Sequence, residues 1–363
     1  MLQRKWVRFL TNNSLNSTPV VSHILLVQWG RRGGGPKFLI TLARQLRALN
    51  LNVSISMVPK YNSSIEDIGV LRGQTHLIDV KKGWDLFSPK KYIENRREFK
   101  KFVREIAPDL IVFVMPHPWD SRLRIDKPTV RILHDFKRHP GDGMWPQNFS
   151  IRKRAHSDSQ VVALSSYITN SLERENINVI KSYHPVFQFK SSDTNKVREI
   201  DVLVIGRMRF YKGTDRLLQI WPKVLSRFPE ARLHIAGEGR IDSQLRELQN
   251  VTIENKWLTE ARISDLLHMS KCALFPYREA SQSGLVPSAS VAGARVVVTP
   301  VGGLIEQAKI FGGLVSDSQS AESLASAILT ILTEPIEMDA TAYDYYNWHL
   351  AKTLCKLTLN SKG

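Results

Sequence analysis

Short runs of β-branched and other apolar residues alternate along the whole chain with longer segments of helical periodicity. This pattern is typical of repeated strand–helix–strand units, whose strands become parallel neighbours in one sheet. The predicted strands of the first half are His23–Gly30, Leu51–Val58, Asp109–Met115, Thr129–Leu133 and Val161–Leu164. Those of the second half are Asp201–Gly206, Arg232–Ala236, Val251–Ile253, Ala273–Pro276 and Arg295–Thr299. The predicted helices include Lys37–Asn50, Pro89–Ile106 and Thr214–Arg227. The fold class is therefore predicted to be α/β, with two successive Rossmann-like sheets.

A polar segment between the two predicted sheets divides the chain. Phe187–Arg198 (FQFKSSDTNKVR) has no helical or strand periodicity, which is typical of a linker. We therefore predict a Rossmann-like domain over residues 1–188, a linker over 189–199 and a second Rossmann-like domain over 200–336. The remaining residues, 337–363, contain the aromatic-rich helical segment Ala340–Leu359, which we expect to pack back toward the first domain.

The composition excludes several classes of protein. Hydrophobic residues make up 42% and charged residues 23% of the 363 positions, close to the average of globular proteins. The two cysteines, Cys272 and Cys355, are too few for a disulfide framework or a four-cysteine zinc site. No stretch approaches 18 consecutive apolar residues, and the basic N-terminal residues lack the apolar core of a secretory signal. We therefore expect a soluble protein of the cytoplasm.

The positive charge is concentrated in the first half. The chain carries a formal net charge of +17, of which residues 1–190 hold +16 and residues 191–363 hold +1. Such an asymmetry indicates an anionic partner, which at this point is a nucleic acid, an anionic membrane surface or a phosphorylated substrate. A solvated basic surface that only aids solubility is the alternative.

Two segments that follow predicted strands have the residue types that bind phosphate groups. Gly33, Gly34 and Gly35 precede a predicted helix, so backbone N–H groups and the helix N-terminus can approach an anion there. Arg207 and Lys212 follow the first strand of the second half, where open α/β sheets bind ligands. Arginine binds phosphate oxygens at two points, and lysine acts as a compact charge. Taken separately, a tight turn and ordinary surface cations explain these segments as well.

A third segment, residues 275–306 (FPYREASQSGLVPSASVAGARVVVTPVGGLIE), combines two strand ends. Ser283 and Gly284 lie where a predicted helix begins, so hydroxyl and backbone donors are available to an anion there. A plain helix cap is the alternative interpretation. Further along, a double glycine precedes Glu306.

Three histidines follow strands of the first half. His117 lies in MPHPWD, and His134 and His139 lie in LHDFKRHPG. Strand carboxyl ends are where such sheets place reactive groups, although a structural histidine is the alternative for each. The chain contains neither an HExxH motif nor an Asp-x-Asp pair, so no metal site is predicted.

Taken together, these segments resemble the retaining family 4 glycosyltransferases of the GT-B fold, and the resemblance spans most of the chain. Its pieces follow the family's order: the glycine loop, GRMRFYKG, LHIAGEG, PYREASQSG and VGGLIE. The C-terminal half is the more specific part. It looks most like the branch of bacterial polysaccharide and lipopolysaccharide enzymes that carry a PYxxxxQSG segment. The resemblance implies two Rossmann-like domains that face each other across a crevice.

The resemblance also implies roles for single residues. Arg207 and Lys212 match the pair that holds the donor diphosphate, and Gly33–Gly35 match the loop that closes over the phosphates. His117 matches a histidine near the transferred sugar. Glu306 matches a frequent acidic residue, which we place in donor binding. His134 and His139 are expected on the acceptor side.

The chain departs from the family at two positions. The family has two glutamates eight residues apart, and these positions hold Ala280 and Ser288 here. Glu279 lies one residue before the first position, so Glu279 and Ser288 are the candidates to stand in for the pair. The helix start at Ser283 and Gly284 is expected to take part in donor anchoring. Which residue replaces the glutamates stays open.

The predicted function is that of a retaining, metal-independent glycosyltransferase. It would move a sugar from a nucleotide-diphosphate sugar, its co-substrate, to a glycan or lipid-linked acceptor in cell-surface polysaccharide biosynthesis. No other cofactor is expected. The charge of the first half predicts peripheral association with the anionic inner face of the cytoplasmic membrane.

A different class of function is carried as an alternative, a basic nucleic-acid- or membrane-binding protein on a degenerate Rossmann scaffold. Its binding would depend steeply on salt and would ignore nucleotide sugars. Nucleic acid is not among the predicted partners, because the basic residues do not interleave with stacking aromatic residues in any nucleic-acid-binding motif.

Overall fold

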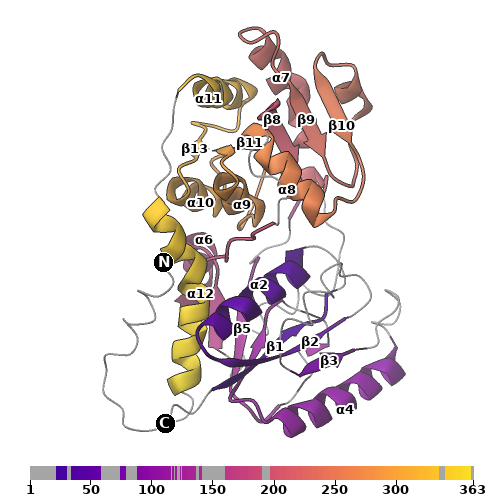
Figure 1. Ribbon diagram of the computed structural model, residues 1–363, viewed down its shortest axis with the longest axis vertical. Coiled ribbons are helices and arrows are strands. Elements are labelled where there is room, and N and C mark those ends of the chain that lie inside the picture. Colours follow the sequence, from indigo (N-terminus) through magenta and orange to yellow (C-terminus); the bar gives the residue numbers. More distant parts are fainter. Residues whose placement is uncertain are drawn as a thin grey trace.

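Two parallel sheets lie one above the other along the long axis of the molecule (Figure 1). The computed structural model describes residues 22–30, 34–58, 74–78, 88–115, 117, 119–120, 123, 125–135, 139–140, 160–189, 197–334 and 340–360. Within these residues, the N-terminal sheet has the order β3-β2-β1-β4-β5-β6-β7 and the C-terminal sheet the order β10-β9-β8-β11-β12-β13. Both orders reverse direction at the first strand of the sheet, which is where ligand crevices open in such folds.

The strands of both sheets are short and mostly buried. The N-terminal sheet contains β1 (His23–Gln28), β2 (Asn52–Met57), β3 (Thr75–Leu77), β4 (Leu110–Phe113), β5 (Thr129–Leu133), β6 (Gln160–Ala163) and β7 (Val179–Lys181). The C-terminal sheet contains β8 (Ile200–Ile205), β9 (Leu233–Ala236), β10 (Val251–Glu254), β11 (Ser270–Phe275), β12 (Arg295–Val298) and β13 (Leu314–Val315). Helices cover both faces of each sheet, so the central strands are continuous apolar runs. The ten predicted strands all form, with ends that differ by up to three residues.

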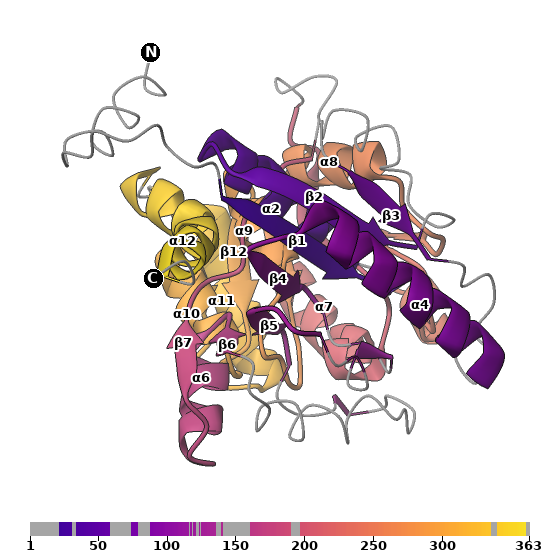
Figure 2. The same cartoon turned by 90° about the horizontal axis from the view of Figure 1, so that it is seen from below.

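Helices α2 and α4 cover opposite faces of the N-terminal sheet (Figure 2). Helix α2 (Gly34–Ala48) packs on the face that contains Ile24 and Leu26, and α4 (Pro89–Ile106) on the face that contains Leu25 and Val27. The N-cap Ser88 accepts a hydrogen bond from the backbone N–H of Lys91, and the proline that follows suits the first helical position. Ser88 and the proline that follows it therefore define where α4 begins.

The C-terminal sheet is covered in the same way. Helices α7 (Leu217–Leu225) and α11 (Ala321–Thr333) pack on one face, and α8 (Glu260–His268), α9 (Leu285–Val291) and α10 (Leu304–Ile310) on the other. The helix predicted over Thr214–Arg227 begins instead as a 3₁₀ turn over Thr214–Arg216, and its α-helical part starts at Leu217.

The last helix, α12 (Ala340–Asn360), lies beside the N-terminal domain although it follows the C-terminal sheet in the chain (Figures 1 and 2). Leu350, Ala351 and Leu354 are fully buried in the same cluster as the apolar face of α2. The side-chain amide of Gln45 donates to the backbone and side-chain oxygens of Asn347, at 2.9 Å each. The final helix therefore completes the core of the first sheet.

The two sheets are joined by polar contacts as well as by the chain. The Ser165 hydroxyl, at the start of α6 (Ser166–Glu173), donates to the carbonyl oxygen of Ser281 at 3.0 Å. Lys37 Nζ lies 2.5 Å from Glu260 Oε2. Helices that could cross a lipid bilayer are absent from the described part of the chain.

Candidate functional site

A cleft of about 350 Å³ lies between the two sheets, where strands of both end. From the N-terminal domain it is lined by the polar side chains of Lys37, His134, Asp135, His139 and His184. From the C-terminal domain it is lined by those of Arg207, Lys212, Glu238, Gln282 and Ser283. Because the carboxyl ends of parallel strands meet at one edge, the loops that follow β5, β7, β8 and β9 converge there.

The loop after β8 brings two cations to the cleft. Gly206, the first loop residue, has φ +123°, and a Cβ atom there would lie 3.3 Å from Lys212 Nζ. Lys212 Nζ donates a hydrogen bond to the Tyr277 hydroxyl at 2.6 Å, and burial lowers the pKa of Lys212. Arg207 is exposed at the cleft wall. The structure thus brings together the two cations that the sequence predicts.

Arg278 anchors this loop. Its guanidinium donates to both carboxylate oxygens of Asp215, at 2.8 and 2.6 Å, and also to the Phe210 carbonyl at 2.9 Å. Its backbone N–H donates to the Tyr211 carbonyl at 2.7 Å. Two-point pairs of this kind fix orientation as well as distance. Arg278 therefore ties the PYREASQSG segment to the loop that carries the cations, a role that sequence reasoning missed.

His134 lies in the cleft and is held from both domains. Its Nε2 lies 2.9 Å from the Val114 carbonyl, and the Gln282 side-chain amide lies 3.1 Å from its Nδ1. Burial lowers the pKa of His134, although the charge of Asp135 and the contact with Val114 oppose this. The ring is therefore neutral near pH 7, with its proton on Nε2.

Asp135 and His139 form a pair beside the loop after β8, residues 206–213 (hereafter the cation loop). His139 Nε2 lies 3.0 Å from Asp135 Oδ1, and the His139 ring stacks on Tyr211 with centroids 4.3 Å apart and planes 16° apart. Burial alone would raise the pKa of Asp135, but hydrogen bonds from His139 and Ser281 and nearby histidine charge lower it. The carboxylate therefore stays charged in the cleft.

His184 also lines the cleft, and sequence reasoning missed it. Its Nδ1 lies 2.6 Å from the Pro185 carbonyl, and burial lowers its pKa to about 3. It follows β7, a three-residue strand whose burial is only partial. No strand was predicted there, so no signal marked His184 as a residue at a strand end.

His117 is not among the residues that line the cleft, so the role near the transferred sugar that the resemblance implies stays a prediction. Its ring lies edge-on to Trp29 and Trp119, at 5.6 Å from each, and its Nδ1 accepts from the Trp119 backbone N–H. Its own backbone N–H donates to Asp120 Oδ2 at 2.7 Å. The turn after β4 therefore folds His117 toward the α4 face of the sheet. His134 and His139 occupy the cleft in its place.

Glu306 is also placed away from the cleft, at the contact between the two domains. Its carboxylate accepts from the backbone N–H and the hydroxyl of Ser166, both at 2.7 Å, and lies 2.9 Å from Lys181 Nζ. Burial would raise the pKa of Glu306, but these contacts outweigh it and lower the pKa. The geometry fits a carboxylate that caps α6 from the opposite domain rather than one that holds a donor.

Neither candidate for the missing glutamate pair lines the cleft. The Ser288 hydroxyl lies 2.9 Å from the carbonyl oxygens of both Phe187 and Gly284, and its side chain is buried. Ala280 is buried and Glu279 is half-buried beside it. Of the polar and glycine positions predicted for this segment, only Ser283 and Gly284, which precede α9, line the cleft.

Of the predicted glycine and serine positions, some line the cleft and others do not. Gly34 lines the cleft at the start of α2, whereas Gly35 is a packing position, since a Cβ atom there would lie 2.4 Å from the Gln28 side chain. Gly33 lies outside the described residues. Ser283 and Gly284 line the cleft, and the Ser283 backbone N–H donates to the Gln307 side chain at 2.8 Å.

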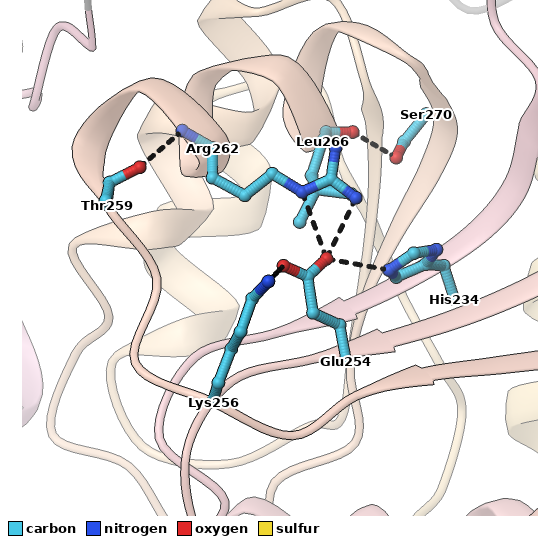
Figure 3. Close-up of polar contacts among 7 residues, drawn as sticks. All are labelled: His234, Glu254, Lys256, Thr259, Arg262, Leu266 and Ser270. Carbon is cyan, nitrogen blue, oxygen red and sulfur yellow. Dashed lines mark hydrogen bonds and ion pairs between the residues drawn. The ribbon is translucent and has the colours of Figure 1, made fainter.

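A second polar cluster surrounds Glu254 (Figure 3). It holds the segment that forms the far wall of the cleft. Arg262 Nε and Nη2 donate to Glu254 Oε2 at 3.0 and 2.8 Å, and Lys256 Nζ lies 3.2 Å from Glu254 Oε1. His234 Nε2 is 3.6 Å from Glu254, and burial lowers the pKa of His234. The cluster braces the chain on both sides of Trp257, which is 49% exposed in the cleft wall.

In the part of the chain that the structure describes, no three histidine, cysteine, aspartate or glutamate residues are placed to hold a metal ion. Among the described residues, the lysine and arginine side chains that line the cleft are Lys37, Arg207 and Lys212.

Comparisons with known proteins agree with this architecture. Residues 199–334 match the family model of glycosyl transferases group 1. A GDP-mannose-dependent monoacylated alpha-(1-6)-phosphatidylinositol monomannoside mannosyltransferase of Corynebacterium glutamicum is 27% identical over 140 residues, which are 36% of this chain. The chain spans 37% of that relative's length, and 50% of the length of an uncharacterised glycosyltransferase of Methanocaldococcus jannaschii that is 24% identical.

Solved structures resemble the whole chain. HepE of Anabaena, in complex with UDP and glucose, has a TM-score of 0.67 at 14% identity and covers 94% of this chain and 100% of its own. Sucrose-phosphate synthase of Thermosynechococcus elongatus has a TM-score of 0.65 at 16% identity, covering 93% of this chain and 98% of its own. These likenesses, with the two parallel sheets, confirm the predicted α/β GT-B fold.

Proposed function

We propose that the protein is a glycosyltransferase that uses a nucleoside diphosphate sugar as its donor. The observation that carries the proposal is the pair of cations, Arg207 and Lys212, in the cleft between the two domains, on a loop inside the region that matches the family model. Open α/β sheets bind ligands at this edge, and a diphosphate is the anion that two such cations suit. The similar Anabaena structure was solved with UDP and glucose, which supports the same ligand class here.

The proposed reaction is metal-independent and retains the configuration of the sugar. Breaking the bond between sugar and diphosphate builds negative charge on the leaving phosphate, which Arg207 and Lys212 would stabilise. The leaving phosphate then takes the proton of the acceptor hydroxyl on the same face of the sugar. No strong protein base is needed on this route, and the neutral His134 fits it.

The acceptor would enter from the N-terminal domain. Asp135 and His139 lie on that side of the cleft, next to Tyr211 of the cation loop, so they are placed to orient an acceptor hydroxyl. We assign the acceptor to the glycan or lipid-linked class used in cell-surface polysaccharide biosynthesis. In the phosphatidylinositol mannosyltransferase relative the acceptor is also a lipid, which supports this class.

Helix α4 would hold the protein on an anionic membrane. It carries seven lysine and arginine residues against three glutamates, and its buried side is apolar while residues such as Lys90, Arg97 and Arg104 are exposed. Each basic residue near an anionic leaflet contributes about 1 kcal/mol of attraction. The result is reversible, charge-driven binding at the inner face of the cytoplasmic membrane.

Ligand binding tests the proposal directly. UDP, GDP, ADP and their sugars are added to the purified protein, and the melting temperature and calorimetric affinity are measured. We expect one nucleoside diphosphate to bind wild type, and Arg207→Ala to lose that binding. Transfer to an acceptor should continue in EDTA. Steep, salt-dependent binding to nucleic acid or vesicles with no response to any nucleotide would favour the alternative of a basic binding protein.

A further inference from the structure

We propose that Gln282 recognises a hydroxyl group of the donor sugar, through its side-chain carbonyl oxygen. The inference rests on the proposed function, because it assumes a nucleoside diphosphate sugar in the cleft. Gln282 lines the cleft from the C-terminal domain, one residue before Ser283. The other candidates on this segment do not offer the missing glutamates' chemistry in the cleft: Ala280 is apolar and buried, Ser288 bonds to backbone carbonyls, and Glu279 does not line the cleft.

The orientation of the Gln282 amide follows from its neighbour. His134 Nε2 lies 2.9 Å from a carbonyl oxygen, the Val114 carbonyl, so this nitrogen must carry a proton. In a neutral ring Nδ1 is then an acceptor. The Gln282 nitrogen, 3.1 Å from Nδ1, must therefore be the NH₂ group, and the opposite end of the amide is the oxygen Oε1.

This oxygen is an acceptor whose bonding is incomplete. Gln282 Oε1 is buried and has no hydrogen-bond partner among the residues that the structure describes. An amide oxygen that is buried without a donor costs free energy, so native structures pair it. Gln282 as a whole is only half-buried in the cleft wall, so a ligand that shifts the side chains around Oε1 can supply the hydrogen-bond donor.

The chemistry of the nucleoside diphosphate sugar decides which of its parts can bond to Gln282 Oε1. Diphosphate oxygens carry no hydrogen at neutral pH, so they cannot donate to Oε1. Sugar hydroxyl groups can. Charged Asp135 lines the cleft from the opposite domain and bonds to Ser281, the residue before Gln282, so a neutral hydroxyl suits the position better than a second anion. Ribose hydroxyls and base N–H groups can donate too, but Gln282 is bonded to His134 of the N-terminal domain, the side from which the acceptor is proposed to enter. We therefore assign the contact to the transferred sugar.

The bond to His134 links sugar recognition to the contact between the domains. Gln282 belongs to the C-terminal domain and His134 to the N-terminal one, so the amide is fixed only when the domains are together. A rigidly held hydrogen-bond acceptor discriminates against sugars that lack the matching hydroxyl, because the desolvation of the Gln282 oxygen is then not compensated by a hydrogen bond.

The test compares the sugar increment in affinity, which is the ratio of the dissociation constant of the nucleoside diphosphate to that of its sugar. Calorimetry gives this ratio for whichever of UDP, GDP and ADP binds wild type best, together with its hexose conjugates. In Gln282→Leu we expect the ratio to fall by about threefold to tenfold, the value of one neutral hydrogen bond, with the affinity for the nucleoside diphosphate unchanged. Gln219→Leu, on an exposed position of α7, is the matched control and should leave both constants unchanged.

A series of deoxy sugars tests the same contact on the unchanged protein, so it does not depend on how the variant folds. One deoxy position should lower the wild-type ratio by the same factor and have no further effect in Gln282→Leu. Equal losses for the nucleoside diphosphate and its sugar, or no sensitive deoxy position, would overturn the inference and leave the proposed function standing. Failure of every nucleotide to bind wild type would overturn the proposed function and this inference with it.

Discussion

The guanidinium of Arg278 and the carboxylate of Asp215 form a two-point ion pair, with N–O distances of 2.8 and 2.6 Å. Arg278 comes from the segment after β11 and Asp215 from the turn after the cation loop. Their pairing closes that loop against the sheet. Lys212 is three residues before Asp215, so its position depends on this pair.

Replacing Arg278 with lysine should therefore weaken donor binding without removing any group that contacts the donor. Lysine keeps the charge but lacks the planar guanidinium that bonds to both carboxylate oxygens, so the loop loses its fixed orientation. We expect the affinity for the nucleoside diphosphate to fall by about tenfold in calorimetry. Glu322→Gln breaks the exposed Lys223–Glu322 pair as a control and should change nothing. An Arg278→Lys protein that binds as tightly as wild type would show that the pair does not position the loop.

Lys212 should make donor binding sensitive to pH. Burial lowers the pKa of Lys212, so its charge is lost as the pH rises through a value below that of an exposed lysine. Affinity for the nucleoside diphosphate should then fall toward alkaline pH, earlier than an exposed lysine would cause. Lys212→Arg should flatten this dependence because arginine stays charged. Lys212→Ala and Arg207→Ala should each reduce turnover by on the order of 100-fold or more. An identical alkaline fall in Lys212→Arg would assign the titration to another group.

Glu306 should matter for stability more than for donor binding. Its pKa is lowered in the folded protein, so its contribution is present above the ordinary glutamate pKa and is lost as the pH falls through the folded value. Glu306→Gln should lower the free energy of unfolding by about 1 to 3 kcal/mol near neutral pH, and the difference should shrink in acid. Denaturation in urea at both pH values measures this. A large loss of nucleotide affinity in a fully folded Glu306→Gln protein would instead support the donor-binding role that the resemblance implies.

His117 and His139 should respond in opposite ways to removal. His117→Ala leaves a cavity among buried aromatic rings, so we expect about 2 to 5 kcal/mol of lost stability. His139→Ala removes a cleft side chain that stacks on Tyr211, and should lower turnover by roughly 10- to 100-fold through misplaced groups, with little change in melting temperature. Thermal melts and steady-state kinetics on both variants check this. A loss of turnover in His117→Ala without a loss of stability, and the opposite in His139→Ala, would support the role near the transferred sugar that the resemblance implies for His117.

Vesicle sedimentation tests the role of α4. Glutamine at Lys90, Arg97 and Arg104 should release the protein from anionic vesicles, because about 3 kcal/mol of attraction is removed. Raising salt to about 0.5 M should do the same to wild type. The control carries glutamine at Lys223, Arg227 and Arg232, which are exposed on the C-terminal domain, and should still sediment. Equal binding to neutral and anionic vesicles would rule out charge-driven docking.

Much of the fold follows from local patterns in the sequence. Helix α4 begins and ends at the predicted residues because Ser88 and Pro89 mark its start and an apolar face of Phe99, Val103 and Ile106 defines its period. The long strands are predictable because they are continuous apolar runs. Strands β3, β7 and β13 have three residues or fewer and are exposed or half-buried, so only pairing with a neighbour defines them.

The candidate site was predictable in the C-terminal domain and less so in the other. Arg207 and Lys212 follow one strand and share one loop, so their convergence is local. Whether a histidine reaches the cleft depends on the side of the sheet toward which its loop turns. No local pattern in the sequence distinguishes a His117 that faces the cleft from one that packs on the Trp29 ring. Glu306 meets Ser166 across 140 residues, a pairing that no local pattern contains.

The position of α12 has a consequence for how the protein is made. Leu350, Ala351 and Leu354 complete the apolar cluster under α2, although more than 300 residues separate Ile24 from Leu350 in the chain. Domains that contain all their own core residues can fold as they leave the ribosome. This N-terminal domain cannot finish in that way, because part of its core is translated after the whole C-terminal domain. Its incomplete apolar face must stay exposed to chaperones during that interval, and the second domain is the first to be complete.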